Sequence, residues 1–531
     1  MRGGRVEFDY VIVGAGSAGC VLANRLTEDP AVEVCLIEAG PRDNSIFIRM
    51  PAALTFPIES DIYNWKFESE PETELNGRTI GQARGRCLGG SSSINGMVFV
   101  RGAAEDYDRW REFGIDGWDF AECLPFFRKL ESFEGGQDPM RGGSGPISVI
   151  RSKADHPLYE AFLDAGRQFG LRDAGDYNSG GQEGVHVTQA TIRDGVRCST
   201  SLAYLVPAMR RPNLTVITNC LVERIEFNGR AASGVTISQC ELRRQINAAR
   251  EVILCAGTIG SPHLLMLSGI GDQTHLRSHG IPSVAHLPGV GADLQDHVVA
   301  PLRYRSTGGI SLRRHLEGFG RFKLGLQWLL FKSGLGATNF FEVGAFFKSR
   351  DDIAQFDMQH EFLPFLADFQ SGRVTISDGF QYFVSQMRPW SRGSIALKST
   401  NPADHPAIRF NYLSDPRDVA EMIAGIRGTL EMAAQPAWSR YKCATENTPD
   451  LRATDAEIAD WLKSAANTEH HPTSTCRMGR DELAVTDAGG KVHGLERLRI
   501  VDGSILPRVP AANINAPIIM VAEKIAATIA R

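Results

Sequence analysis

The segment DYVIVGAGSAGCVLANRL, near the start of the chain, constrains the fold more than any other part of the sequence. Residues 9–13 form an apolar run typical of a buried strand, and residues 18–26 carry apolar side chains at helical spacing. Between them, Gly14, Gly16 and Gly19 have the G-x-G-x-x-G spacing, which lets the backbone approach a pyrophosphate at the N-terminus of a helix. This segment therefore predicts the strand, turn and helix of a dinucleotide-binding α/β domain.

A second predicted strand strengthens this interpretation. Residues 32–37 are mostly apolar and lead to Glu38, nineteen positions after Gly19, where an acidic side chain hydrogen-bonds ribose hydroxyl groups. A carboxylate there would repel a 2′-phosphate, which argues against NADP. The alternative is an ordinary βαβ unit with a glycine turn and a surface glutamate, and the unit alone leaves the choice between NAD and FAD open.

Three later segments favour a long cofactor. GRCLGGSSSINGMVFVRG at residues 85–102 is too rich in glycine and serine for a regular element, and it offers many backbone N–H groups and hydroxyls. REVILCAGTIGSP at residues 250–262 and LRIVDGSILP at residues 498–507 each predict a strand that ends in a glycine turn. Strand ends from both extremes of the chain would then lie beside one nucleotide, as expected for a cofactor extended across a sheet.

Composition and charge argue against several classes of protein. A chain of 531 residues, 43% of them hydrophobic, is expected to form two domains. A net charge of −5, without a run of Lys or Arg, argues against a nucleic-acid partner. The ten cysteines form no CxxC pair, so neither a metal site nor a disulfide framework is predicted. The first residues lead straight into a strand and leave no room for a secretory signal, which predicts a cytoplasmic protein.

The run LGLQWLLF at residues 324–331 is the part of the chain that comes nearest to a membrane segment. It is too short to span a bilayer. We expect it to form a buried helix face, and the alternative is peripheral docking at the inner membrane.

Six motifs follow one another along the chain: VGAGSAG, GRCLGGSSSING, AGTIGSPHLLMLSGIG, PGVGADLQDH, HHPTSTCRMG and NINAP. In this order they resemble the glucose-methanol-choline (GMC) oxidoreductases, FAD-dependent enzymes that act mostly on alcohols. The resemblance covers essentially the whole chain. Within the family, the chain is most similar to bacterial choline, aliphatic alcohol and sorbose dehydrogenases, which share motifs but not substrates.

The resemblance implies an α/β fold with two domains. A Rossmann-like FAD-binding domain would be assembled from residues 1–155, 205–300 and 465–531, and a discontinuous substrate-binding domain with an antiparallel sheet from residues 156–204 and 301–464. The sequence agrees with a second type of sheet, because FQYFVSQMRPWSRGSIALKST at residues 380–400 has β-rich runs around a Pro/Gly turn, the pattern of an antiparallel hairpin.

The resemblance also implies which residues bind FAD. Relatives with a covalent flavin carry a histidine in the glycine-serine loop, and Ile94 occupies the matching position, so we expect non-covalent FAD. The residues implied to bind the cofactor are Gly14, Gly16, Ser17, Ala18, Gly19, Glu38, Ala39, Arg86, Gly89, Gly90, Ser91, Asn95, Gly96, Val98, Val222, Gly257, Asp502, Gly503, Pro517 and Ile518.

TEHHPTSTCRMG, which begins at Thr468, places two histidines directly before a proline. Pro472 disfavours helix for the preceding residue, so His471 is expected in extended backbone, with His470 pointing to the opposite side. In the family the residue before this proline is the catalytic base, a role that the resemblance transfers to His471. The usual histidine pKa of about 6.5 suits proton acceptance near neutral pH. His470 would border the substrate cavity or pack in the core.

The motif NINAP supplies the expected partner of this base. Asn515 matches the second active-site position of the family, which holds histidine or asparagine, and its amide would donate to the substrate oxygen as that oxygen gains negative charge. A helix is predicted after Pro517, so the alternative is that Asn515 caps this helix. Many relatives have a threonine where this chain has Ile518, which leaves only a backbone N–H for the flavin.

Two further residues bear on the substrate. Trp65 and Glu342 match positions that help to hold a quaternary ammonium in choline-oxidising relatives, and an aromatic face with a carboxylate suits a cation. Relatives that oxidise uncharged alcohols carry a similar pair, so the implied substrate is a primary alcohol, with choline among aliphatic, sugar and furanic candidates. The electrons would pass to a quinone-like carrier or to O2, with a dehydrogenase favoured over an oxidase. The alternatives are a flavin-containing lyase and an NAD-linked dehydrogenase.

Overall fold

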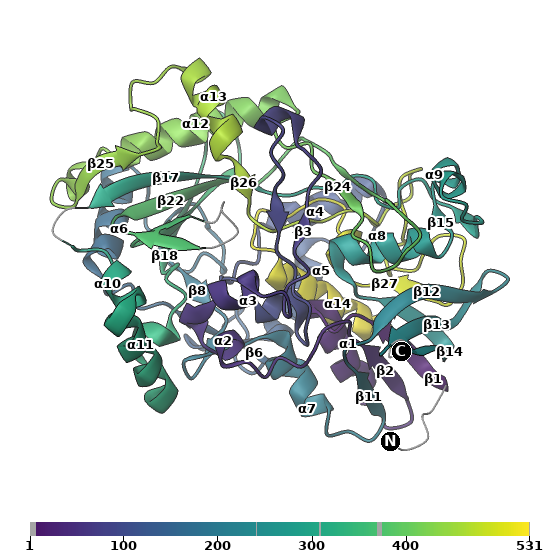
Figure 1. Ribbon diagram of the computed structural model, residues 1–531. Coiled ribbons are helices and arrows are strands. Elements are labelled where there is room, and N and C mark those ends of the chain that lie inside the picture. Colours follow the sequence, from purple (N-terminus) through teal and green to yellow (C-terminus); the bar gives the residue numbers. More distant parts are fainter. Residues whose placement is uncertain (1–6, 241, 307–308, 369–373, 530–531) are drawn as a thin grey trace.

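Two seven-stranded sheets organise the computed structural model, which describes residues 7–240, 242–306, 309–368 and 374–529. The first sheet lies at the lower right of Figure 1, and the second lies at the upper left. Helices pack around both sheets. This arrangement confirms the predicted α/β fold with two types of sheet.

The first sheet contains the predicted nucleotide-binding unit. Its strands run in the order β11 (Leu214–Ile217), β2 (Val34–Ile37), β1 (Glu7–Val13), β14 (Leu242–Leu254), β13 (Ala231–Gln239) and β12 (Leu221–Asn228), and β27 (Leu498–Ile500) pairs with β14. β1 is parallel to β2 and β14, whereas β13 is antiparallel to β12 and β14. The buried side chains of β1 and β2 confirm the two strands predicted from their apolar runs.

Helix α1 (Ser17–Leu26) follows β1 through the glycine turn and contacts the C-terminal helix α14 (Asn515–Ile529). A Cβ at Gly19 would lie 1.9 Å from the carbonyl oxygen of Gly14, so the helix approaches the strand this closely only because residue 19 is glycine. Arg25 and Glu523 join the two helices by an ion pair in which Nη2 lies 2.6 Å from Oε1. The two ends of the chain are thereby held together.

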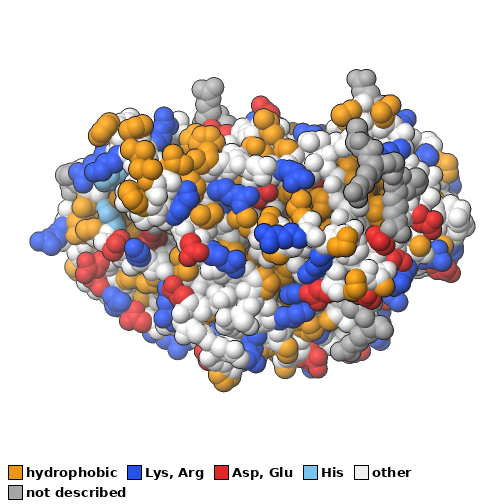
Figure 2. All heavy atoms as spheres, turned by 90° about the horizontal axis from the view of Figure 1, so that it is seen from below, with side chains coloured by type: hydrophobic (Ala, Val, Ile, Leu, Met, Phe, Trp, Pro, Cys, Tyr) orange, Lys and Arg blue, Asp and Glu red, His pale blue; other side chains and the backbone are white. Residues whose placement is uncertain are grey.

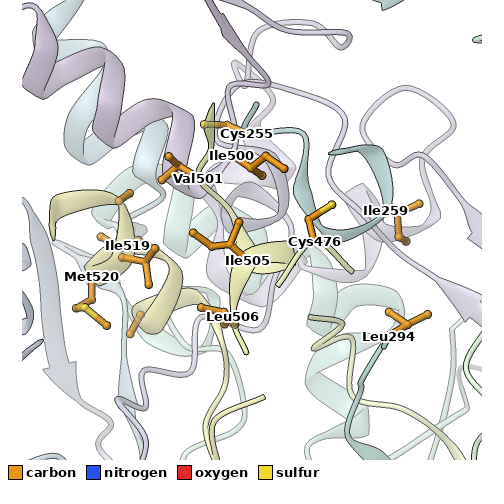
Figure 3. Packing of buried hydrophobic residues seen from close by; sticks show 14 of the residues in the cluster. Cys255, Ile259, Leu294, Cys476, Ile500, Val501, Ile505, Leu506, Ile519 and Met520 are labelled. Atoms are coloured by element: carbon orange, nitrogen blue, oxygen red, sulfur yellow. The ribbon is translucent and has the colours of Figure 1, made fainter. Parts of the chain in front are cut away.

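A buried apolar cluster fixes the C-terminal segment against the first sheet, as Figure 3 shows. Ile500 of β27 and Ile519 of α14 belong to this cluster, together with Cys476 of the motif HHPTSTCRMG. Ile259 of helix α8 (Gly257–Leu267) and Cys255, which precedes this helix, come from the middle of the chain. This packing brings distant segments of the sequence to one edge of the sheet.

The second sheet is antiparallel throughout. Its strands run in the order β25 (Lys442–Glu446), β17 (Val298–Ser306), β22 (Phe380–Gln386), β19 (Met358–Leu363), β18 (Val343–Phe347) and β7 (Gly184–Val187), and β26 (Asn467–Thr468) pairs with β17. On one face, Phe162 of helix α6 (Pro157–Phe169) packs on Phe362 and Tyr382. Because side chains alternate along a strand, Glu361 and Phe383 point to the opposite face.

The division of the chain between the two sheets bears on the predicted domains. All strands of the first sheet lie within residues 1–155, 205–300 and 465–531. In the second sheet, β17 crosses residue 300, and β26 lies in the C-terminal segment. The domain boundaries stay a prediction.

The predicted hairpin within residues 380–400 is wrong. β22 pairs with β17 and β19, whereas β23 (Ser394–Ala396) pairs with β24 (Ala407–Arg409) in a separate small sheet. The cause lies in the connection between them. The carboxylate of Asp418, in helix α12 (Pro416–Met432), accepts the backbone N–H groups of Trp390 and Ser391, which turns the chain away from β22.

Helix α11 (Gly318–Phe331) contains the run LGLQWLLF, and the predicted burial of this run is largely wrong. Only Leu324 and Trp328 of this helix are buried, because they alone face the rest of the protein. Further helices are α5 (Phe120–Leu130), α9 (Gln273–Ser278) and α13 (Asp455–Ala465). Within the described ranges, no helix has both the length and the apolar character needed to cross a membrane.

Candidate active site

A cavity of about 1010 Å³ is lined by residues from both sheets. The glycine turn after β1 and Glu38 after β2 form part of its wall, and Glu361 and Phe383 of the second sheet form another part. The carboxyl ends of the parallel strands β1 and β2 therefore open into the cavity, the usual position of a nucleotide in a sheet of this type. Residues 467–472, which contain the two adjacent histidines, complete the wall.

Most of the residues predicted to bind FAD line this cavity. They are Gly14, Gly16, Ser17, Ala18, Glu38, Ala39, Gly90, Ser91, Asn95, Gly96, Val98, Val222, Gly257, Asp502, Gly503 and Ile518. Gly19, Arg86, Gly89 and Pro517 lie outside the lining. Gly19 packs against Gly14, the guanidinium of Arg86 lies 5.1 Å from the ring centre of Trp65, and the N–H of Gly89 donates to the carbonyl of Ala15. These residues therefore lie outside the cavity lining, and the contacts of Gly19, Arg86 and Gly89 support the wall of the cavity.

The lining fits a dinucleotide. The N-termini of α1 and α8 both meet the cavity, and a Cβ added at Gly257 would find no atom within 4 Å, so the first turn of α8 is open to a ligand. Helix N-termini favour negatively charged groups such as a pyrophosphate. Asp502 accepts the N–H of Gly257 and the hydroxyl of Ser261, which holds this helix end in place.

Glu38 lies beside the glycine turn, where the ribose was predicted. Its Oε2 accepts the N–H of Ala15 and its Oε1 accepts the N–H of Gly40, both at 2.9 Å. Burial raises the pKa of this carboxyl to about 7. The side chain therefore braces the turn and also faces the cavity. Ile94, at the position linked to covalent flavin, is a buried aliphatic side chain in the lining.

His471 is half-buried in the cavity wall, next to a second histidine. Its Nδ1 lies 3.0 Å from Nδ1 of His297, and its backbone N–H donates to Oδ1 of Asp296 at 2.7 Å. Burial lowers the pKa of His471 well below its usual value, and the neighbouring His297 lowers it further. The imidazole is therefore neutral near pH 7, which is the protonation state that a base requires.

His470 does not follow the extended-chain prediction. Its φ angle is 62°, in the left-handed region, so the two histidine side chains do not alternate as they would in a strand. The carbonyl oxygen of His470 accepts from Nη2 of Arg84 at 2.7 Å, which accounts for this backbone conformation. Both histidines line the cavity, so His470 borders it and is not confined to the core.

The structure places Asn513, and not Asn515, next to His471. Nδ2 of Asn513 lies 3.4 Å from Nε2 of His471 and donates to Oε1 of Glu361 at 3.0 Å. Oδ1 of Asn515 instead accepts the hydroxyl of Ser17 at 2.7 Å, at the start of α1. Asn515 is the first residue of α14, and Asn513 lies in the segment before that helix. Asn515 also lines the cavity, so its predicted role as a donor to the substrate oxygen stays a prediction.

Two carboxyl groups face the same part of the cavity. Burial raises the pKa of Glu361 to about 6. Burial, followed by repulsion from Glu361, raises the pKa of Glu469 well above its usual value, and the hydroxyl of Ser385 donates to Glu469. Because like charges oppose each other's ionisation, the two carboxyls do not lose their protons independently, and the first to ionise leaves a negative charge in this wall.

Of Trp65 and Glu342, the two residues matched to positions that hold a quaternary ammonium in relatives, only Trp65 lines the cavity. Oε2 of Glu342 accepts the backbone N–H of Ala154 at 2.7 Å, and this side chain is buried outside the lining. A role for Glu342 in holding a cation is therefore not supported by the geometry. Glu361, on the neighbouring strand β19, carries the carboxylate that faces the cavity.

Sequence reasoning missed several residues of this site, and the signals for them differ in strength. Asp296 and His297 end the motif PGVGADLQDH, and the polar residues at its end are a signal that was not used. Glu469 directly precedes the two histidines, and an acid in that position was a usable signal. Glu361 lies in an ordinary strand, where nothing in the sequence marks it.

Comparisons with known proteins agree with the geometry. Two family models, each described as GMC oxidoreductase, match residues 8–299 and 389–522. An oxygen-dependent choline dehydrogenase of Vibrio vulnificus is 45% identical over 98% of this chain and 94% of the relative. The enzyme with the same name from Brucella canis is 44% identical over 98% of this chain and 95% of the relative.

Solved structures share the fold over nearly the whole chain. The pyridoxine 4-oxidase of Mesorbium loti superimposes with a TM-score of 0.89 at 29% identity and covers 98% of this chain and 99% of its own. A formate oxidase variant of Aspergillus oryzae gives a TM-score of 0.92 at 26% identity, covering 98% of both chains. The lining of the cavity, the two matching family models and the full-length relatives lead to one conclusion: this chain belongs to the GMC oxidoreductases, a family of FAD-dependent alcohol oxidoreductases.

Proposed function

We propose that this protein oxidises a primary alcohol to the aldehyde, with His471 as the base and Asn513 as its partner. The observation that carries this proposal is the neutral, half-buried imidazole of His471, whose Nε2 lies 3.4 Å from Nδ2 of Asn513 in the wall of the nucleotide cavity. FAD, when bound, supplies the hydride acceptor. The electrons then pass to a quinone-like carrier or to O2.

The contacts around His471 suit proton removal from a hydroxyl group. If Nδ1 of His471 donates to Nδ1 of His297, Nε2 carries a free lone pair that accepts the alcohol proton. Asp296 holds the backbone N–H of His471 and so fixes the ring in place. The amide of Asn513, held by Gln359 through its Oδ1 at 3.2 Å, then donates to the oxygen that gains negative charge.

The carboxyl pair favours an alcohol that carries a positive charge. Glu361, whose carboxyl has a pKa of about 6, lies with Glu469 in a wall that also contains Trp65, Phe341 and Phe383. A carboxylate with aromatic faces stabilises a cation such as a quaternary ammonium. The names of the relatives with 44–45% identity, which refer to choline, support a choline-like amino alcohol as the substrate.

Anaerobic mixing with alcohols tests the proposed reaction directly. We expect choline, among a panel of aliphatic, sugar and furanic alcohols, to bleach the yellow colour of the FAD-loaded protein without O2. A panel in which no alcohol bleaches the flavin would refute the proposal and favour a reaction that does not cycle the cofactor. The oxidised product is identified as the aldehyde, and turnover with O2 and with an artificial quinone separates the two acceptors.

Replacing Glu361 with Gln is expected to lower kcat/KM for choline by roughly tenfold or more, because a charge–charge contact in a dry site is lost. In the wild type, kcat/KM for choline should rise as the pH increases through about 6, where the carboxyl of Glu361 ionises. The variant should lose this rise. The uncharged carbon isostere of choline serves as the control, because its kcat/KM should change little. Equal losses for both substrates would mean that Glu361 acts only by holding Asn513.

Replacing Glu38 with Ala is expected to weaken FAD binding by about 10- to 100-fold, since charged hydrogen bonds contribute roughly 1.5–3 kcal/mol. Glu38→Gln, which keeps the size and one oxygen acceptor, is the matched control and should lose less. The measurement is the dissociation constant of FAD, followed by the flavin-to-protein ratio after acid precipitation, which should release all the flavin. Unchanged FAD affinity in Glu38→Ala would count against the ribose assignment.

A further inference from the structure

Helix α11 exposes a large apolar face. Six of its apolar side chains are exposed: Phe319, Phe322, Leu326, Leu329, Leu330 and Phe331, with Phe319 at 79% and Phe331 at 71% of full exposure. At 3.6 residues per turn, the first five fall within an arc of about 100°. A soluble helix normally turns such a stripe toward the core, whereas α11 turns it outward.

The orientation of α11 is held from its inner side. Leu324 and Trp328 form a buried cluster with Met50 and Ala53, and Nε1 of Trp328 donates to the carbonyl of Gly195 at 2.6 Å. These contacts fix the helix on the protein. The outward direction of its apolar stripe is therefore a property of the fold.

Positive charge surrounds this stripe. Residues 313–332 contain five basic side chains, namely Arg313, Arg314, Arg321, Lys323 and Lys332, against a single acid, Glu317, so the segment carries +4 in a chain of net charge −5. Among the described residues, only Arg313 of these five forms an ion pair, with Glu317 and Asp378. Figure 2 shows hydrophobic and basic side chains gathered at the left, where Figure 1 places α10 (Arg313–Leu316) and α11.

The apolar surface continues onto two short helices next to α11. Phe47 of α2 (Ile46–Arg49) and Phe56 of α3 (Thr55–Glu59) are exposed, and their rings stack at 4.4 Å. The turn between α2 and α3 contains Ala53, which packs in the same cluster as Trp328. The exposed surface thus extends beyond one helix.

We propose that α11, with α2 and α3, docks the protein on an anionic lipid surface. An apolar helix face with Phe and Leu at its centre and Lys and Arg around it lies in the interface of a bilayer, with its apolar side chains below the headgroups. Basic side chains beside it add attraction to anionic lipids. A second copy of this chain is a poorer occupant, because symmetric pairing would place the same +4 segments against each other.

This docking would place one wall of the cavity at the membrane. Leu54 and Ile58 line the cavity, and Phe56, between them in the sequence, is exposed on the docking surface. A lipid-dissolved electron acceptor would then reach the protein on the side where α3 separates the cavity from the docking surface. The docking itself rests on α11 and not on the proposed reaction.

Sedimentation with sucrose-loaded vesicles tests this proposal on the FAD-loaded full chain. We expect the wild type to bind vesicles that contain about one third phosphatidylglycerol in phosphatidylcholine, and to bind pure phosphatidylcholine more weakly. The combined variant Phe322→Gln, Leu326→Gln and Leu330→Gln should bind at least about tenfold more weakly. The matched control replaces Leu242, Leu451 and Leu483, which are exposed elsewhere, with Gln and should bind like the wild type.

A second variant distinguishes the contribution of the positive charge to vesicle binding from that of the apolar face. Arg321→Gln with Lys323→Gln should lower binding to the anionic vesicles by about fivefold for each charge removed, and hardly affect binding to phosphatidylcholine. Turnover with a soluble dye should stay unchanged in every variant, since these residues lie outside the cavity. Equal vesicle binding by the wild type and the α11 variant, or no binding by the wild type, would overturn the proposal. Self-association in sedimentation velocity that only the α11 variant abolishes would assign the surface to a dimer instead.

Discussion

Replacing His471 with Ala is expected to slow flavin reduction by an alcohol about 10²- to 10⁴-fold, the range typical for the loss of a general base. The side chain lies half-buried next to His297 and Asn513, and desolvation together with His297 lowers its pKa and keeps the imidazole neutral. The variant should stay folded and yellow, because the cofactor contacts come from other segments. Anaerobic stopped-flow measurement of flavin reduction gives the rate, and thermal unfolding with and without FAD checks the fold.

His470→Ala is the matched control for this prediction. It removes a neighbouring imidazole from the same cavity wall, yet the backbone contact between the carbonyl of His470 and Arg84 stays possible. We expect a change in KM or in alcohol preference, with fast flavin reduction by at least one alcohol. If His470→Ala stalled and His471→Ala reduced its flavin at the wild-type rate, the base would be the other histidine.

The pH dependence of this step follows from the low pKa of His471. A histidine acts as a base only in its neutral form. Because the pKa of His471 lies well below 6.5, essentially all of its imidazole is neutral at pH 7 and above. The rate of flavin reduction at saturating alcohol should therefore not rise between about pH 7 and pH 9 on account of His471. A single rise near neutral pH that disappears in His471→Ala would show that the imidazole is less buried than the structure indicates.

Replacing Asn513 with Ala is expected to lower the rate of flavin reduction by about 10²- to 10³-fold, the cost of removing one donor to a developing oxyanion. Asn515→Ala should cost much less in that rate, because the side chain of Asn515 contacts Ser17 and not His471. The comparison is informative because the two asparagines lie two residues apart in the same motif. Flavin reduction and FAD affinity are measured for both variants.

The opposite result would restore the family-based assignment. If Asn515→Ala lost the larger part of the rate and Asn513→Ala kept it, the alcohol oxygen would lie nearer the N-terminus of α14 than to Glu361. Asn513→Asp adds a further check. It replaces the amide by a carboxylate beside Glu361, so it should lower the rate about as much as Asn513→Ala, through repulsion of the forming alkoxide.

The sequence by itself determined the nucleotide-binding unit and the position of the two histidines. The apolar run of β1, the three glycines and Glu38 are local features, and each depends on a rule that acts over a few residues. The motifs that identified the family are also short, and their order is read directly along the chain. His471 was assigned because the resemblance places the catalytic base directly before the proline of this short motif. None of these inferences required knowledge of which distant segments meet.

Only the tertiary structure decided the residues that meet from distant parts of the chain. The register of β19 against β22 turns Glu361 and Phe383 toward the cavity, and a shift of one residue would bury them instead. The left-handed backbone of His470 depends on Arg84, which lies 386 positions away in the sequence. Asn513 and Asn515 look alike in sequence, and the packing of α14 decides which of them reaches His471. Such contacts depend on strand register and helix packing, which no short-range pattern in the chain encodes.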